Sequence, residues 1–528
     1  MPEESHHEAL RERIIGCDRE EPGRQPIISS IGIPTCDRPD ALHRCAKSFL
    51  DNCRVYGRKP RVLVTDDSTL PAYQAANVAY LKNLHRVYPE FQFTYAGFAE
   101  KRSYSKTLAR FCGLDPAVLE FALFNPENLS RIACGPNRNA LFLETVGECF
   151  LSVDDDVVCH PSVEPNMSRV VKVTSRYDPT RVWMFPDRQT LLRDRPSCVV
   201  DLLALQESIL GKSLGALLHS RPEQSVVFGR LSRNFRYRLQ SGPTRIKVSW
   251  NGIYGDSGAR YPNYYLWKDR SIFQQLTAGE EIYRSLSLSR QIFRSPACLT
   301  VGASGYCQST ALAYDHRALL PPFMPLRGLD FVFGQTLVTC FRDSLIGYHP
   351  WALMHAPVEA RRNSSEDIQR GSEAICYYEI LKALIATYSD GNSGTTGSES
   401  LQKLGDHLCS IGALSAGEFE ELLQSCLWGR IGRRINRFDR ILQDAPQAPR
   451  YWADDLLAQI RVLRGKLTAA GLRQSVLAEE SNLPPEQRVV LAQRLTARFG
   501  RLLQAWPALI EAVRDLKAKE THLGRPLP

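Results

Sequence analysis

The sequence predicts an α/β protein followed by an all-α carboxy-terminal region. Between residues 27 and 95, apolar strand-like runs alternate with segments whose apolar residues recur at helical spacing. This alternation is typical of a parallel sheet with crossover helices. From residue 401 to 521 the apolar residues keep helical spacing. A chain of 528 residues is also long enough for two or more domains.

Composition narrows the class of protein. Hydrophobic residues make up 43% of the chain and charged residues 23%, which is ordinary for a soluble globular protein and excludes a disordered one. The net charge of +9 suits an anionic ligand, but over this length it is too mild to indicate nucleic acid. The start of the chain lacks a signal pattern and no apolar run reaches about 18 residues, so we expect no membrane span.

The number and spacing of the cysteines indicate a reducing cellular compartment. The 15 cysteines are odd in number and scattered, and no two form a Cys-x-x-Cys pair. This pattern favours reduced thiols over a disulfide framework or a zinc ribbon. We therefore expect a cytoplasmic protein.

The first elements form a βαβ unit. Residues 1–25 are charged and contain Pro and Gly, which predicts a flexible arm. A strand at 27–33 runs into a Pro-bounded loop at 34–39, a helix at 40–53 and a second strand at 61–65. A strand, helix and strand at this spacing predict two parallel strands.

A second helix at 73–88 and a third strand at 91–95 follow. Residues 135–139 then open a helix over 140–146, with Arg138 in its first turn. An arginine there opposes the helix dipole, so an anionic group should hold it. That group is either a ligand or a carboxylate of the protein.

The stretch 150–159 is the most informative, because three successive carboxylates interrupt an apolar run. A strand at 149–153 should end in Asp154, Asp155 and Asp156, and alternation along it would point the outer two to one side. Two such carboxylates suit Mg²⁺ or Mn²⁺, which typically also bind substrate phosphates. The alternative is a solvated acidic turn.

The predicted strand ends bring further carboxylates to the same place. Asp37 follows the first strand, and Asp66 and Asp67 follow the second. Ligands of parallel sheets gather at the carboxyl ends of the strands. We therefore expect these side chains to share one edge with the three successive aspartates.

Two later regions complete the pattern. Strands are expected at 182–185 and 226–228, and aromatic loops at 252–258 and 261–267 either stack on a substrate or pack internally. Beyond residue 363 a helix to 388 and a flexible break near 389–400 precede the helices of 401–521. This helical region would cover the ligand site, bind another protein or form a homodimer.

Four motifs together resemble the family-2 nucleotide-sugar glycosyltransferases of the GT-A fold. They are the strand and loop at 31–39, the strand end at 64–68, the Arg-Asn helix start at 137–139, and an Asp-x-Asp element at 154–156. The resemblance implies a GT-A domain at 26–363, with a Rossmann-like nucleotide-binding half to about 160 and an acceptor half after it. Residues 364–528 would then be a helical carboxy-terminal domain.

The resemblance also implies site residues. Asp67 would contact the nucleobase and Arg138 the diphosphate or base. The remaining donor contacts would come from Pro34, Thr35, Asp37 and Asp155. Asp154 and Asp156 would bind the metal ion, joined by His355 at the end of a closing strand at 345–355. Asp330, at a helix start, would be the catalytic base, although Leu329 replaces the acidic residue often found before it, and a helix-capping role is the alternative.

The expected activity is a metal-dependent transfer of a sugar from a nucleoside-diphosphate donor to a hydroxyl or thiol of a saccharide or protein acceptor, with inversion. Two alternatives stay open. A sugar-nucleotidyltransferase also uses paired carboxylates, but the glycine- and basic-rich loop that it favours after the first strand is missing here. A catalytically inactive GT-A scaffold that binds a partner is the other.

Overall fold

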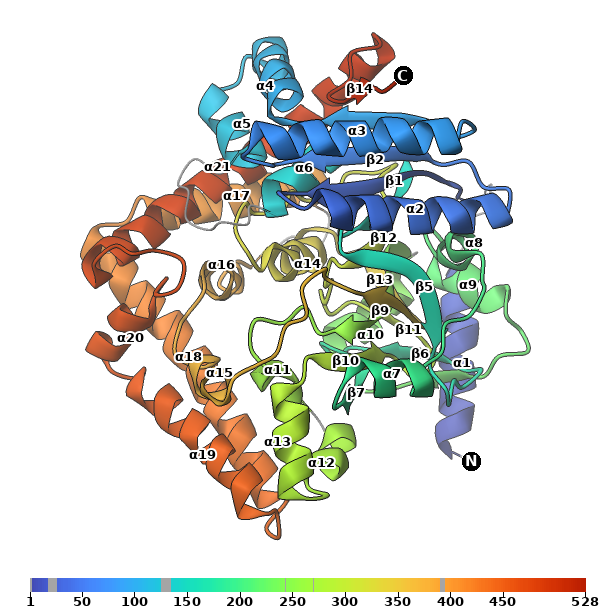
Figure 1. Ribbon diagram of the computed structural model, residues 1–528. Coiled ribbons are helices and arrows are strands. Elements are labelled where there is room, and N and C mark those ends of the chain that lie inside the picture. The colour runs from blue at the N-terminus through green and yellow to red at the C-terminus, as the bar shows by residue number, and fades with distance from the viewer. Residues whose placement is uncertain (1, 18–25, 125–133, 243, 269, 390–394) are drawn as a thin grey trace.

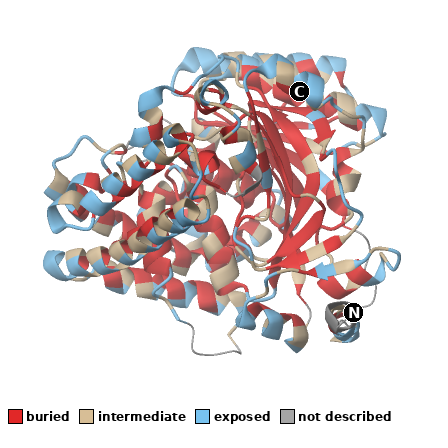
Figure 2. Cartoon of the chain, turned by 90° about the horizontal axis from the view of Figure 1, so that it is seen from below, coloured by how far each residue is buried: buried red, intermediate tan, exposed pale blue. Residues whose placement is uncertain are grey.

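The computed structural model describes residues 2–17, 26–124, 134–242, 244–268, 270–389 and 395–528. In these ranges all fourteen strands belong to one mixed sheet that runs through the molecule (Figure 1). Helices flank the sheet, and its strands are buried along most of their length (Figure 2). The chain is therefore an α/β protein with a helical carboxy-terminal region.

The amino-terminal part of the sheet is parallel and consists of β1 (Ile28–Thr35), β2 (Arg61–Asp66), β3 (Phe93–Ala96) and β4 (Cys149–Val153). These bounds confirm the four predicted strands to within about two residues. The crossover helices are α2 (Pro39–Val55), α3 (Pro71–Val87), α4 (Phe98–Cys112), α5 (Pro116–Leu123) and α6 (Cys134–Glu144). Proline opens α2, α3 and α5, where its missing N–H costs no hydrogen bond.

The strand order creates a topological switch point at the ends of β1 and β4. The order β3-β2-β1-β4 shows that the chain proceeds outward from β1 to β3 and then returns to add β4 on the other side of β1. The crossovers on the two sides of β1 therefore diverge at the carboxyl ends of β1 and β4. In open parallel sheets such a switch point is where ligands bind.

The sheet continues beyond β4 with mixed strand directions. Its further strands are β5 (Val157–Val163), β6 (Val171–Thr174), β7 (Arg181–Phe185), β8 (Val226–Phe228), β9 (Arg245–Asp256), β10 (Gln291–Ser295), β11 (Leu299–Gly302), β12 (Ala311–Asp315) and β13 (Ser344–His355). β12 lies antiparallel to β4, and the long strands β9 and β13 follow it. The helices in this part are α7 (Arg188–Asp194), α8 (Leu202–Glu207), α9 (Leu214–His219), α10 (Arg233–Ser241), α11 (Asn263–Leu266), α12 (Arg270–Leu276), α13 (Glu280–Leu288) and α14 (Leu329–Cys340).

The amino-terminal segment differs from the predicted flexible arm. Residues 2–17 form α1 (Pro2–Cys17), and Leu10 and Ile14, one helical turn apart, are buried in a cluster with α9, α10 and β8. The prediction of a flexible arm followed from the charge and the Pro and Gly content of this segment and overlooked its short apolar stripe. Burial of that stripe stabilises the helix. Residues 1 and 18–25 of the predicted arm lie outside the described residues.

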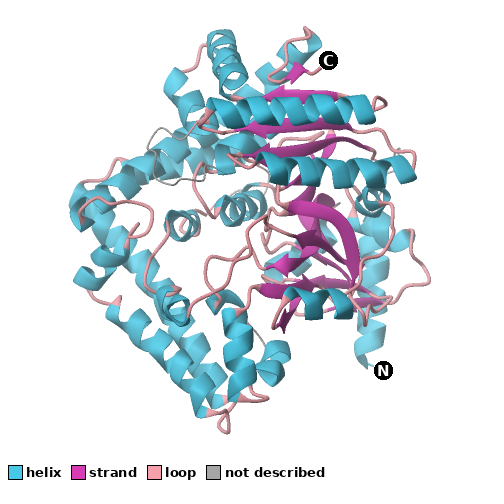
Figure 3. Cartoon of the chain, viewed as in Figure 1, coloured by secondary structure: helices cyan, strands magenta, loops and turns pink. Residues whose placement is uncertain are grey.

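The carboxy-terminal region is helical, as predicted, and lies beside the sheet (Figure 3). Its elements are α15 (Ser365–Arg370), α16 (Tyr377–Ile385), α17 (Gly397–Gly412), α18 (Ala416–Gln443), α19 (Arg450–Gly465), α20 (Ala469–Ser475), α21 (Pro485–Ala518) and the short strand β14 (Arg525–Pro526). The predicted break near 389–400 overlaps residues 390–394, which are outside the described part, but its end is already helical because Thr396 caps α17.

This helical region shares a hydrophobic core with the amino-terminal half. α21 packs on α4, α5 and α6, and Trp506 within it is buried and donates a hydrogen bond to the carbonyl of Leu320 at 2.8 Å. β14 then pairs antiparallel with β3 at the edge of the sheet. The end of the chain therefore returns to the parallel half. No helix in the described ranges is both long and apolar enough to cross a membrane.

Candidate functional site

A cluster of charged side chains lies at the switch point between β1 and β4. It is formed where β1, β2 and β4 end, where α2 and α6 begin, and where β13 ends. Asn137 joins these pieces: its side-chain amide donates to the carbonyl of Thr35 at 2.9 Å, and its own carbonyl accepts from the hydroxyl of Thr65 at 3.2 Å. The start of α6 is thereby fixed to the ends of both β1 and β2.

The three carboxylates after β4 lie in a turn. The N–H of Val157 donates to the carbonyl of Asp154 at 3.0 Å, so the chain reverses over residues 154–157 instead of remaining extended. The predicted alternation therefore does not hold. Asp155 and Asp156 share one arginine, whereas Asp154 pairs with another.

The two arginines come from the starts of two helices. Arg38, the residue before α2, contacts Asp155 Oδ1 and Asp156 Oδ2, each at 2.9 Å. Arg138 on α6 pairs with Asp154, so the anionic group that the sequence requires near Arg138 is a carboxylate of the chain. Every carboxylate of the turn thus has a guanidinium partner.

The surroundings shift the pKa values of these three carboxylates in different directions. The side chain of Asp155 is fully buried and accepts from the hydroxyl of Thr35 at 2.7 Å. Burial raises the pKa of Asp154 and Asp155 in spite of their arginines. At Asp156 burial acts in the same direction, but His355 and Arg38 outweigh it and lower the pKa of that carboxyl.

His355 reaches the turn because of strand register. β5 begins at Val157, directly after the turn, and pairs antiparallel with β13 so that Val157 lies opposite His355. Nδ1 of His355 donates to the carbonyl of Asp256 at 2.7 Å, which turns Nε2 toward Asp156 Oδ1 at 3.1 Å. Burial disfavours charging of this imidazole, but Asp156 and Asp256 prevail and raise the pKa of His355 to about 9.

A divalent cation fits part of this arrangement. Ligands about 2.1 Å from an octahedral ion lie roughly 3 Å apart, which is the spacing of Asp156 Oδ1 and His355 Nε2. Asp156 Oδ1 is also buried without a well-aligned hydrogen bond. The predicted set of three with Asp154 is not assembled, and over the described ranges no three His, Cys, Asp or Glu side chains gather as metal ligands. Mg²⁺ and Mn²⁺ commonly complete such a pair with water and substrate phosphates.

Asp67, the predicted nucleobase contact, lies in a buried polar group at the end of β2. Its Oδ1 pairs with Lys101 of α4, a fully buried lysine that also donates to Asn137 Oδ1 at 3.0 Å. Its Oδ2 is buried without a hydrogen-bond partner. Burial raises the pKa of Asp67 although Lys101 opposes it. One oxygen therefore remains for a donor from outside the group.

The residues predicted from the first loop have different surroundings. Pro34 and Thr35 end β1, opposite Thr65 and Asp66 of β2. Asp37 has a positive φ of 55°, and its carboxylate accepts from the N–H of Thr69 at 2.9 Å. The carboxylate of Asp37 therefore ties the loop after β1 to the loop after β2.

Asp330 approaches the same cluster from the acceptor half. It lies in the first turn of α14, and its carboxylate accepts from the N–H of Ser309 at 3.2 Å. The carbonyl of Ser309 accepts from Arg138 at 3.2 Å, so a single residue separates Asp330 from the arginine that pairs with Asp154. Burial raises the pKa of Asp330, and Arg138 lowers it less. The helix cap is Gly328, so Asp330 is not the cap itself.

Residues 252–256 of the first predicted aromatic loop belong to β9 instead, and the second aromatic segment, at 261–267, packs internally around a buried arginine. Arg294 donates to Asp178 at 2.7 Å and to Gln308 at 2.6 Å, and its guanidinium lies over the ring of Tyr306 at 4.7 Å. Tyr265 is buried beside it. Gln308 precedes Ser309, so this network supports the segment that bridges Asp330 and Arg138.

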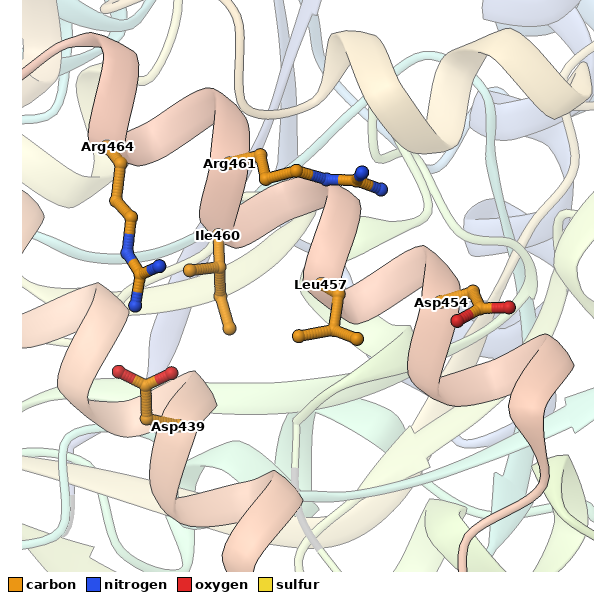
Figure 4. A pocket seen from close by; sticks show the side chains of 6 residues that line it. All are labelled: Asp439, Asp454, Leu457, Ile460, Arg461 and Arg464. Atoms are coloured by element: carbon orange, nitrogen blue, oxygen red, sulfur yellow. The ribbon is translucent and has the colours of Figure 1, made fainter.

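A pocket on the helical region is separate from this cluster. It lies between α18 and α19 and is lined by Asp439, Asp454, Leu457, Ile460, Arg461 and Arg464. Figure 4 shows Arg464 and Asp439 pointing toward one another across it. Its lining mixes apolar and charged side chains, and none of the predicted site residues contributes to it.

Sequence reasoning missed Arg38 and Lys101. The signal for Arg38 is the same as for Arg138, because an arginine beside a helix start opposes the dipole and needs an anionic partner. Lys101 sits in the first turn of α4, and no local pattern marks it as buried. Comparison with known proteins adds nothing here: no protein-family model matches the chain, and no curated protein matches it significantly.

Proposed function

We propose that the protein is a glycosyltransferase of the GT-A type, which takes a sugar from a nucleoside-diphosphate donor. One observation carries this proposal: the switch point between β1 and β4 gathers carboxylates, arginines and a histidine that suit a diphosphate with a divalent cation. The motif resemblance agrees with this proposal, because residues of all four motifs lie at this same edge of the sheet.

On the donor side we propose a role for each group. Asp67 Oδ2 accepts a hydrogen bond from the nucleobase, since it is the buried oxygen that Lys101 leaves unpaired. Arg38 binds phosphate oxygens, for which a guanidinium group is well shaped, and the buried Arg138 adds positive charge near the diphosphate. Asp156 and His355 would hold Mn²⁺ or Mg²⁺, and the ion would supply positive charge to offset that of the diphosphate leaving group.

The acceptor side contributes the base. Asp330 accepts the proton of an acceptor hydroxyl or thiol, and the freed electron pair attacks the anomeric carbon opposite the diphosphate. A raised pKa makes this carboxylate a better proton acceptor near neutral pH. A single carboxylate on this side fits one displacement with inversion. The acceptor belongs to a saccharide or a protein.

The thiols support a reducing compartment. All 15 cysteines are free in the structure. Disulfides are rare in the cytosol, where thiols stay reduced. We therefore place the protein in the cytoplasm.

The test is release of nucleoside diphosphate from a panel of nucleotide sugars, measured with and without Mn²⁺. We expect release from one donor class, dependent on the cation, and faster release when a hydroxyl or thiol acceptor is added. Release from no donor in the panel, with folded protein, would contradict the proposed activity and favour a scaffold that binds without turnover.

A further inference from the structure

The two arginines of the acidic turn differ in their freedom to move. Arg138 is 4% exposed and is also bound to the carbonyl of Ser309, so it is fixed in place. Arg38 is 45% exposed, yet the carboxylates beneath it, Asp155 and Asp156, are 0% and 7% exposed. Arg38 therefore covers two buried carboxylates from the solvent side.

This position conflicts with a cation on Asp156. A guanidinium held 2.9 Å from Asp156 Oδ2 repels a divalent ion that approaches Oδ1 of the same carboxylate. Water screens this repulsion on the exposed side of Arg38, but it does so less on the side of the buried carboxylates, where the cation would bind. A cation alone should therefore bind poorly while Arg38 stays in place.

A diphosphate removes the conflict. Its oxygens offer Arg38 a bidentate partner of the same kind as the two carboxylates, and guanidinium groups bind phosphate well. If Arg38 transfers to the diphosphate, Asp156 keeps only His355 as a close cationic partner, and a divalent cation would displace the Nε2 proton to bind Asp156 Oδ1 and His355 Nε2 together. The diphosphate draws Arg38 away from Asp156, and the cation replaces Arg38 as the partner of that carboxylate. Binding of each ligand therefore favours binding of the other.

We propose that Arg38 is an exchangeable counter-ion that makes the binding of a divalent cation and of a diphosphate depend on each other. It holds Asp155 and Asp156 before ligands bind, and it moves to the diphosphate when a cation takes its place on Asp156. The inference rests on the proposed function for the chemistry of the ligand. It does not require that transfer occurs.

The first test measures Mn²⁺ alone, by electron paramagnetic resonance of the free ion. In Arg38→Gln we expect Mn²⁺ to bind roughly fivefold tighter or more than in wild type, because Asp156 has lost its guanidinium. Adding Asp156→Asn to that variant should abolish the gain, which locates the ion. Arg54→Gln is the matched control, since Arg54 lies on α2, is also 45% exposed and pairs with Glu90 away from the site.

Removing Arg38 leaves Asp155 buried without its charge partner, which threatens folding. The double variant Arg38→Gln with Asp155→Asn avoids this problem, because it removes one positive and one negative charge together. Asp156 keeps both oxygens in this variant. We expect it to fold like wild type and to bind Mn²⁺ more tightly, as the single variant does.

The second test adds inorganic pyrophosphate as the diphosphate probe. In wild type we expect pyrophosphate to tighten Mn²⁺ binding by about 5- to 150-fold, and Mn²⁺ to tighten pyrophosphate binding by the same factor, since coupling is reciprocal. In Arg38→Gln this mutual tightening should largely disappear.

Unchanged or weaker Mn²⁺ binding in both Arg38 variants would overturn the inference, even if sugar transfer is observed. Conversely, tighter Mn²⁺ binding with lost coupling would uphold it even if no nucleotide sugar is turned over. The two proposals therefore fail separately.

Discussion

At the scale of single residues, Asp330 carries the chemical step in this account. Changing Asp330 to Asn removes the proton acceptor but keeps an oxygen for the N–H of Ser309. We expect transfer to fall by about 10²-fold or more, because a general base acts only in the transition state, while donor affinity barely moves. Transfer rates and donor titrations on the same variant measure both. A fully active variant would remove Asp330 from the mechanism.

A second prediction at this scale concerns the buried ion pair of Asp67 and Lys101. Asp67→Asn should lower the free energy of unfolding by about 3–5 kcal/mol, because it leaves a fully buried lysine without its partner charge. Asp67→Asn combined with Lys101→Met should recover much of that loss. If Asp67 also contacts the nucleobase, the double variant will unfold like wild type yet bind nucleoside diphosphate more weakly. Wild-type affinity in a stable double variant would refute that contact.

Much of the residue-level site follows from the sequence, but the pairing within it does not. The carboxylates after β1, β2 and β4 and the need of Arg138 for an anion are visible because strands, helix dipoles and charges have local signatures. The partners of Asp154 and Asp156 depend on a turn at 154–157, which interrupts the alternation that a strand would give. Local spacing cannot show which way such a turn directs each carboxylate.

At the scale of elements, Glu480 couples the start of α16 to the loop after α20. Its carboxylate accepts from the N–H of Tyr377 at 2.7 Å. Burial raises its pKa from 4.5 to about 7, with Glu379 and Glu479 adding to the rise, and the Tyr377 N–H and Arg260 opposing it. The folded protein therefore holds this proton where the unfolded chain has released it.

The stability of the protein should fall as pH rises through this window. Because the folded state binds more protons between about pH 4.5 and 7, Glu480 contributes up to about 3 kcal/mol below pH 4.5, and this contribution is lost as pH passes 7. Glu480→Gln keeps the acceptor for Tyr377 and removes the titration. Denaturant unfolding at several pH values should give a flatter profile for the variant; identical profiles would contradict the assignment.

Elements with strong local signals were predictable, and those set by distant contacts were not. The strands and helices of residues 27–95 agree with the sequence because each has a clear apolar period. The segment 364–388 was expected to be one helix, but it forms α15, which Ser364 caps, and α16. Ile375 between them pairs with residues 475–477 instead, a contact that lies about a hundred residues away in sequence.

At the scale of the whole molecule, the shared core changes the expected effect of truncation. The Gly/Ser-rich break near residue 394 and the donor residues of the amino-terminal half predict that a chain ending there keeps donor binding and loses acceptor transfer or dimer formation. In the structure, α21 supplies Trp506 and its neighbours to the core under α4, α5 and α6. We therefore expect residues 1–389 alone to lack a cooperative unfolding transition, and co-expression with residues 395–528 to restore one. A stable fragment 1–389 that binds nucleotide would contradict the shared core.

The sequence indicates a helical region but not where it packs. Helical spacing identifies the apolar faces of α17 to α21 without naming the surface that covers them. Burial of these faces on the parallel half brings β14 to the edge of β3, where it pairs with Thr94 and Tyr95 and covers part of that edge. The helical region is thus part of the scaffold that holds the switch point in place.

The central claim is that the edge between β1 and β4 binds a nucleoside diphosphate together with a divalent cation. Calorimetric titration of a panel of nucleoside diphosphates in the presence of Mn²⁺, into wild type and Asp156→Ala, tests it most directly. We predict one site per chain in wild type for at least one nucleobase, and loss of cation-dependent binding in Asp156→Ala, with Arg54→Gln behaving as wild type. No binding to folded wild type, or equal affinity in wild type and Asp156→Ala, would contradict the claim.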